Sequence, residues 1–451
     1  MHLRDFLNSN TSFDVDLPEG REDGKITFAR YLAGNRHADD VDLLGNVDGG
    51  EALGDMLNDA SNPKTADVPE PPASDKTAHE IWENDRLTRA AIAANTMAGY
   101  QDGLDYSHSA WLSDPDHVKG EDVFGHKNPA LRSWMGSIIS PYVDDLASEM
   151  HNSTGEGMEA SSAPGEGHSA HMQFGRDIVT RFKKEGGLLQ DLAFDQPKLE
   201  SDGGTKKNLL DDKYEGGRMP ALQAVQVAAY TGYMGDVYDG LQDPDYNVRM
   251  QKVQGASDRW TELIHETFDA KADQSTAIGK ALDESNKRAR QIVDFIVEKG
   301  TGYAASQMPA GGALAEKAAQ AAAGEALDHF FPTDNELKGW ESHSKMDDKS
   351  HDLMQDGLIR AMYDSDHWTE NAGKVDVSPG TQALADKGLA FVNPDGTRDS
   401  YDSLSKVERD SVRQYFRGKN SDFRPLLDGQ YNAQQNAQDD GRVEKPSSGG
   451  K

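Results

Sequence analysis

The sequence predicts an all-α protein: a multi-helix bundle with long polar loops and a disordered C-terminal tail. Apolar residues recur at helical spacing along most of the chain, and no segment shows a convincing β-strand alternation. Hydrophobic residues make up only 36% of the 451 residues, and the mean hydropathy is −0.76. Part of the chain is therefore expected to be loop or tail rather than core.

Polar stretches rich in proline or glycine set the expected limits of the regions. In order, these are an N-terminal region of short helices (1–62), a proline-rich linker or loop (63–77), a helical domain (78–199), a polar loop (200–219), a helical bundle with an Ala/Gly-rich helix (220–366), a region of short helices (367–429) and a disordered tail (430–451). We found no fixed-period repeat.

In the N-terminal region, residues 26–32 and 50–60 are expected to be helical. Leu53, Met56 and Leu57 fall on one face of the second helix. A long helix is expected at 78–104, followed by a loop at 114–127. Its core-like positions are Ile81, Leu87, Ile92 and Met97.

The stretch "NPALRSWMGSIISPYVDDL" predicts a capped core helix with a kink. Asn128 suits an N-cap and Pro129 suits a first helical turn. Pro141 should kink or restart the helix, with Ser140 as a possible new cap. Gly136 would let a neighbouring helix pack closely. We interpret Trp134, Met135, Ile138 and Tyr142 as packing anchors and expect them to be buried.

From Pro220, placed for a first helical turn, the chain is expected to be helical through most of its length. Further helices are expected at 246–270, 275–299, 334–365 and 400–417. Between them, residues 302–331 are rich in alanine and glycine, which allows close helix packing. Glu316, Lys317 and Glu325 argue against insertion of this segment into a membrane.

The formal net charge of −31 counts against some classes of partner. It disfavours nucleic acid and anionic membrane surfaces, which are both negatively charged. The chain has no cysteine, so it has no disulfide, thiolate zinc site or Cys nucleophile. It shows neither a classical signal peptide nor an apolar run that could span a bilayer. We expect a protein secreted by a non-classical route or retained in the cytoplasm.

The sharpest catalytic candidate is His265-Glu266-x-x-Asp269, which differs from the zinc-protease helix motif in one ligand. His265 and Asp269 are four residues apart, so they share a helix face and could both bind a metal. Glu266 could then act as a general base. No third ligand is evident in the sequence, and the alternative interpretation is an ordinary acidic helix.

Other motifs are incomplete, and no cofactor is expected. The stretch 391–402 places carboxylates at calcium-loop positions, but Phe391 occupies the first ligand position. The histidines are dispersed without regular spacing, and no nucleophile elbow or phosphate-binding glycine loop is present.

Small type VII secretion substrates of actinobacteria carry Trp-x-Gly at the turn of a helical hairpin, usually followed by a Tyr-x-x-x-Asp/Glu signal. Here Trp134-Met135-Gly136 lies inside a helical stripe, and no tyrosine has Asp or Glu four residues later. The chain instead resembles larger helical actinobacterial proteins of unknown function associated with that secretion system. The similar segments are 26–61, 128–146 and 221–336, in that order.

The resemblance implies a helical fold and a setting linked to type VII secretion, and it brings no catalytic residues. Our leading hypothesis is therefore a non-enzymatic interaction or scaffold protein with a protein partner. One alternative is a toxin-like or metal-dependent hydrolase that uses His265, Glu266 and Asp269. A second alternative is a membrane-active effector acting through residues 302–331.

Overall fold

The computed structural model describes the residues of eleven segments and shows an all-α architecture, as the sequence predicts. The described segments are 3–9, 26–34, 49–62, 71–72, 74–113, 124–153, 187–195, 220–278, 343–365, 399–417 and 424–432. No strand occurs within them. Their buried apolar side chains, from Leu7 to Leu427, form one continuous core.

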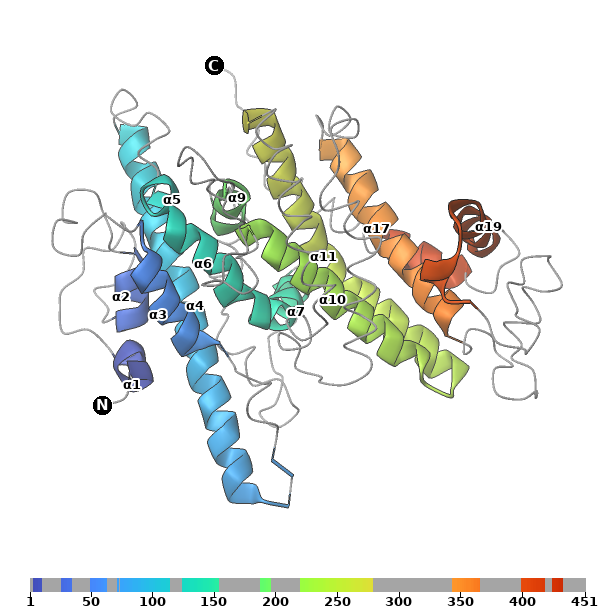
Figure 1. The fold of residues 1–451 in the computed structure, drawn as a ribbon, viewed down its shortest axis with the longest axis horizontal. Coiled ribbons are helices and arrows are strands. Elements are labelled where there is room, and N and C mark those ends of the chain that lie inside the picture. Colours follow the sequence, from blue (N-terminus) through green and yellow to red (C-terminus); the bar gives the residue numbers. More distant parts are fainter. Residues whose placement is uncertain are drawn as a thin grey trace, which may run out of the picture.

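The N-terminal helices pack along one long helix (Figure 1). They are α1 (Leu3–Asn8), α2 (Phe28–Gly34) and α3 (Glu51–Ser61), and the long helix is α4 (Lys76–Ser113). The predicted face of α3 is confirmed, since Leu57 is buried and Leu53 and Met56 pack against the core.

Two glycines let α2 and α4 approach until their backbones touch. A Cβ atom on Gly34 would collide with the carbonyl of Gly99, and one on Gly99 would collide with the carbonyl of Arg30. Beside this contact, Arg30 binds Asp102 through two hydrogen bonds, Nε to Oδ2 at 2.6 Å and Nη2 to Oδ1 at 3.1 Å. The short helix α2 is therefore fixed both by backbone packing and by a bidentate ion pair.

Short helices connect α4 to the centre of the molecule. They are α5 (Phe124–Lys127), α6 (Pro129–Ile139), the 3₁₀ turn η3 (Ser140–Tyr142), α7 (Val143–Ser153) and α9 (Leu188–Ala193). α6 contacts α3 on one side and α10 on the other, and α7 packs on α10 and α11.

The centre is an antiparallel hairpin of α10 (Ala221–Leu241) and α11 (Tyr246–Ile278) (Figure 1). Asp245 caps α11, because its Oδ1 accepts hydrogen bonds from the backbone N–H groups of Asn247 (2.8 Å) and Val248 (3.1 Å). Pro220 lies at the N-cap of α10, one residue before the first helical turn expected for it.

The C-terminal helices cover the far side of the hairpin. α17 (His343–Asp364) packs on α10 and α11, and it is in turn contacted by η5 (Tyr401–Ser403) and α19 (Lys406–Phe416). α19 begins with a capping box, in which Ser405 Oγ accepts from the N–H of Glu408 and the Glu408 carboxylate accepts from the N–H of Ser405.

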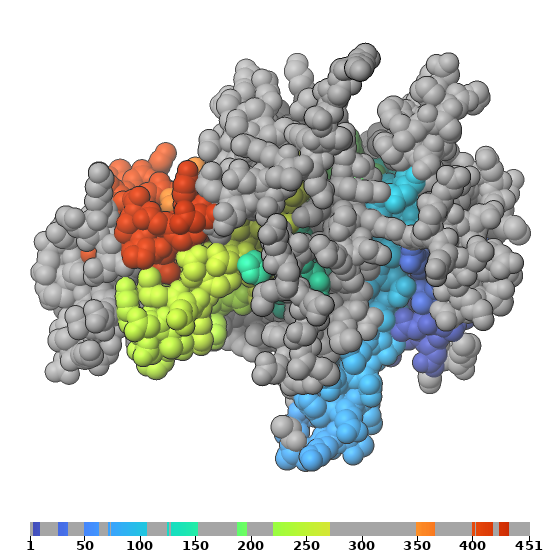
Figure 2. All heavy atoms as spheres, turned by 180° about the vertical axis from the view of Figure 1, so that it is seen from behind, coloured from blue at the N-terminus to red at the C-terminus, as the bar shows by residue number. Residues whose placement is uncertain are grey.

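The first turns of α4 protrude from the body, and one prediction is wrong there. Figure 1 shows the start of this helix extending past α1 and α3, and Figure 2 shows the same protrusion in space-filling form. Ile92 and Met97 are buried as expected, and Leu87 is half-buried. Ile81, however, is 66% exposed, because the stripe continues beyond the helices that cover α4. We name residues 76–84 the α4 spur.

Several predicted boundaries also shift. α4 begins two residues before 78 and runs nine residues past 104, and residues 124–127 of the expected loop form α5. α11 ends eight residues after 270, and the last described helix, 424–432, extends past residue 429. Most of 275–299, all of 302–331 and residues 433–451 lie outside the described residues.

Within the part of the chain that the structure describes, none of the helices is both long and apolar enough to cross a membrane.

Candidate functional site

The Trp-x-Gly stretch is part of the core. Trp134, Met135, Ile138 and Tyr142 are all buried, as expected from the sequence. A Cβ atom on Gly136 would lie 2.5 Å from the Cα atom of Ala221, so the absence of a side chain lets the start of α10 rest on α6. The burial and this close approach make the triplet a packing element between α3, α6 and α10.

Two capping details of this stretch differ from the prediction. Asn128 precedes α6, but its side chain makes no cap and its Nδ2 donates to the Phe124 carbonyl at 3.0 Å. Ser140 donates back to the Gly136 carbonyl at 2.6 Å rather than capping a new helix. Pro141 does interrupt the helix, since η3 separates α6 from α7. The sequence located the break correctly but assigned the wrong hydrogen bonds.

His265, Glu266 and Asp269 lie on α11, where His265 Nε2 is 3.8 Å from Asp269 Oδ2. His265 is buried, and Glu266 and Asp269 are half-buried. His265 and Asp269 share one helix face, and Glu266, the residue after His265, does not lie on it. Among the described residues, no three His, Asp or Glu side chains gather as a metal site would require. The hydrolase hypothesis stays a prediction, and the described segments provide no third metal ligand for it.

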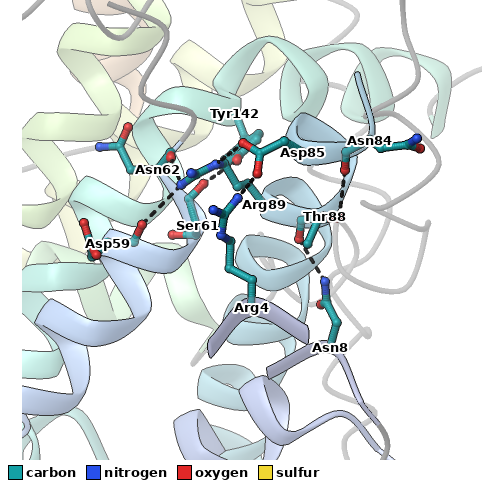
Figure 3. A network of polar contacts seen from close by, with 10 residues as sticks. All are labelled: Arg4, Asn8, Asp59, Ser61, Asn62, Asn84, Asp85, Thr88, Arg89 and Tyr142. Atoms are coloured by element: carbon teal, nitrogen blue, oxygen red, sulfur yellow. Dashed lines mark hydrogen bonds and ion pairs between the residues drawn. The ribbon is translucent and has the colours of Figure 1, made fainter. Parts of the chain in front are cut away.

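A polar network fixes the base of the α4 spur (Figure 3). Arg89 donates from Nη1 to the carbonyls of Asn62 (2.6 Å) and Asp59 (3.3 Å) at the end of α3, and from Nε to Asp85 at 2.7 Å. Arg4 of α1 also pairs with Asp85. Because these contacts tie α1 and α3 to α4, the helix is anchored where it leaves the body.

A buried ion pair lies where α4, α6 and α9 meet. Arg132 donates from Nη2 to Asp191 Oδ1 at 2.7 Å and from Nε to Asp191 Oδ2 at 2.9 Å. Tyr100 donates its hydroxyl to the same carboxylate at 2.7 Å. Burial disfavours the charge on Arg132, but the Asp191 carboxylate, together with smaller contributions from Tyr100 and Asp195, outweighs burial and raises the pKa of the guanidinium. Burial, followed by the same carboxylate, raises the pKa of Tyr100 well above its usual range.

A second arginine joins three helices nearer the surface. Arg259 of α11 binds Asp144 of α7 and, at 2.5 Å, Asp236 of α10. Trp260 Nε1 donates to Asp236 Oδ2 at 2.6 Å, and the Arg259 guanidinium lies 5.2 Å from the Trp260 ring centroid. Burial raises the pKa of Asp236, although Arg259 and the Trp260 hydrogen bond oppose the shift.

Asp145 is the most perturbed carboxyl of this region. Burial raises its pKa to about 7, and the adjacent Asp144 carboxylate adds to the shift. Arg86 and Arg259 oppose it without cancelling it. A carboxyl that titrates near neutral pH is a marker of functional sites, although structural ion-pair networks also produce it.

The sequence interpretation missed both arginine clusters. A signal did exist for the buried one, because Arg132 is the single charged residue in the mostly apolar stretch "PALRSWMGSII" and Asp191 is the single charged residue in "LLQDLA". A charge inside an apolar helical stripe needs a buried partner. No comparable signal marks Arg259, whose surroundings on α11 are mostly polar.

Comparison of the chain with protein-family models, curated proteins and solved structures finds no match.

Proposed function

We propose that this chain is a non-enzymatic helical interaction or scaffold protein that works alongside actinobacterial type VII secretion. The observation that supports the interaction role best is the α4 spur. Where this helix leaves the body, Ile81 is exposed and the adjacent Trp82 is half-buried, so the spur presents two neighbouring large apolar side chains that another protein could cover. The secretion setting rests on the resemblance of the sequence.

The side chains of the spur have the character of an interface. Ile81 is largely exposed, and the neighbouring Trp82 is half-buried. The Arg86 guanidinium lies 4.7 Å from the Trp82 ring centroid, and the His79 ring stacks against that indole at 5.7 Å. Tryptophan and arginine are enriched at the energetic centres of protein interfaces. These contacts hold the indole in place beside Ile81.

Two groups of buried polar side chains are already used for packing, which agrees with a scaffold. Arg132 and Asp191 satisfy each other, and Arg89 is bound to the end of α3. Neither set presents a nucleophile or an acid–base pair to a cleft.

A photo-crosslinking amino acid at position 81 tests the interaction role in the cells that produce the protein. We expect discrete crosslinked species from position 81 that disappear when Trp82→Ala is added. Val407 is 75% exposed on α19, so the same label there is the matched control for exposure alone. Crosslinks of equal pattern from both positions, or none from position 81, contradict the proposal.

The secretion setting has a separate test. The chain is expressed in an actinobacterial host whose type VII system is either intact or inactivated. Dependence of its location or of its position-81 crosslinks on the intact system supports the setting. Identical results in the two hosts contradict it without affecting the interaction role.

A further inference from the structure

The α4 spur has an apolar centre with an acidic side chain on each side of it. Ile81 and Trp82 are bracketed in the sequence by Glu80 and Glu83, and both glutamates are exposed. Successive residues of a helix are about 100° apart around its axis, so Glu80 lies beside Ile81 and Glu83 lies beside Trp82. Lys76 is the only exposed cation of the spur. A protein that covers the apolar pair therefore brings the rim of its contact surface against carboxylates.

The arginines at the base of the spur are already engaged. The Arg86 guanidinium lies 4.7 Å from the Trp82 ring centroid. Arg89 donates to Asp85 at 2.7 Å, and Arg4 pairs with the same carboxylate. These three guanidinium groups serve contacts within the chain, so the two glutamates set the charge at the rim of the apolar pair.

Neither glutamate is neutralised by its own chain. Within the segments that the structure describes, no cation forms an ion pair with Glu80 or Glu83. The whole chain carries a formal net charge of −31. Like charges that meet across an interface oppose binding, and opposite charges speed association. A second copy of this chain and an acidic partner are therefore disfavoured, and a basic partner is favoured.

We propose that the spur binds a basic amphipathic segment of a partner protein, which covers Ile81 and Trp82 with apolar side chains and places Lys or Arg beside Glu80 and Glu83. The inference rests on the interaction role proposed above and adds the chemistry of the partner. The apolar contact holds the complex together, and the charges select the partner and speed its association.

Two synthetic helical peptides with identical apolar positions test this choice of partner. One carries Lys at the flanking positions, and the other carries Glu. The binding of each to the full chain is measured by biolayer interferometry at low and high salt. We expect the Lys peptide to bind about tenfold more tightly at low salt, with a smaller advantage at high salt. Equal affinities, or binding of neither peptide, overturn the proposal.

Charge reversal on the spur should slow association of the Lys peptide. We expect Glu80→Lys/Glu83→Lys to lower the association rate about tenfold with little change in the dissociation rate. The matched control is Asp55→Lys/Asp239→Lys, which reverses two exposed carboxylates on α3 and α10 and changes the net charge equally. Its association rate should fall less than about twofold. Equal falls in the two variants overturn the proposal, because the peptide then responds only to net charge.

The apolar centre is tested by its own variant. Ile81→Ala should raise the dissociation rate of the Lys peptide about tenfold, because it removes apolar surface from the contact. An unchanged dissociation rate overturns the proposal. Sedimentation of the full chain tests a second copy as the occupant. A dimer that Ile81→Ala dissociates would assign the spur to self-association and overturn the basic partner.

The crosslinks from position 81 separate this inference from the interaction role. They are repeated in cells with Glu80→Lys/Glu83→Lys and with Asp55→Lys/Asp239→Lys. Loss of the crosslinks in the first variant alone supports a basic partner. Crosslinks that persist unchanged in the first variant overturn the basic partner and leave the interaction role intact. Absence of crosslinks from the native sequence around position 81 contradicts both.

Discussion

Arg132 and Arg259 each bind carboxylates from neighbouring helices, but they do so in different surroundings. Arg132 and its partner Asp191 are 4% and 7% exposed, whereas Arg259 and Asp236 are 25% and 38% exposed. Water does not reach the first pair, so it cannot solvate the charge that remains when one partner is removed. The second can exchange part of its interaction with water, so its strength depends on protonation and salt. Two similar ion pairs therefore differ in their response: the buried pair is shielded from solvent, and the partly exposed pair is sensitive to salt and protonation.

The largest expected effect comes from breaking the buried pair. Arg132→Met leaves Asp191 buried without its cation, which should reduce the free energy of unfolding by about 3–5 kcal/mol. Denaturant unfolding followed by circular dichroism measures the change. The double variant Arg132→Met/Asp191→Leu should recover most of the loss, because neither member of the pair is then left as a buried charge without its partner. A cost below about 1 kcal/mol for the single change would show that this pair behaves like a surface pair.

A smaller effect should follow from crowding the same pair without removing a charge. A Cβ atom on Gly125 would collide with the Asp191 carboxylate and the Arg132 guanidinium. Gly125→Ala should therefore cost about 1–3 kcal/mol in the same unfolding measurement. Gly255 on α11 has nothing within 4 Å of an added Cβ, so Gly255→Ala is the matched control and should gain up to about 1 kcal/mol. Equal effects from both substitutions would contradict close packing at Gly125.

The smallest effect on stability is expected at the partly exposed Arg259 pair. Arg259→Gln should cost about 1 kcal/mol at low salt and less at high salt, because the pair is partly solvated and screened. Unfolding at two ionic strengths measures both values. Arg424→Gln, which removes an ion pair between two exposed side chains at 2.7 Å, should have still less effect. A salt-independent cost equal to that of Arg132→Met would remove the distinction between the two arginines.

Helical spacing predicted much of the fold because it reports directly on local geometry. It located α3, α6, α10 and the start of α11, and it identified Trp134 and Met135 as buried. It was wrong at Ile81 because periodicity shows that one face of a helix is apolar, not that another helix covers that face. The spur is therefore visible only once the neighbours of α4 are placed.

The arginine clusters could not be predicted from the sequence for a related reason. Arg132 and Asp191 are 59 residues apart, and Arg259 and Asp144 are 115 residues apart. Which charges meet over such separations depends on the order in which helices pack, and that order is decided by the whole core. The apolar sequence around Arg132 indicates that this charge needs a buried partner, but it does not identify the partner.

The position of α9 has a consequence for the order of folding. This helix has only six residues, too few to be stable alone in water. Its first N–H group, on Leu188, donates to Gln101 at 2.7 Å, and its Asp191 binds Arg132 and Tyr100. Every one of these partners belongs to α4 or α6. α9 also packs on α10 and α11. We therefore expect α9 to form after its neighbours have met, so changes within it should speed unfolding and leave the rate of folding nearly unaltered.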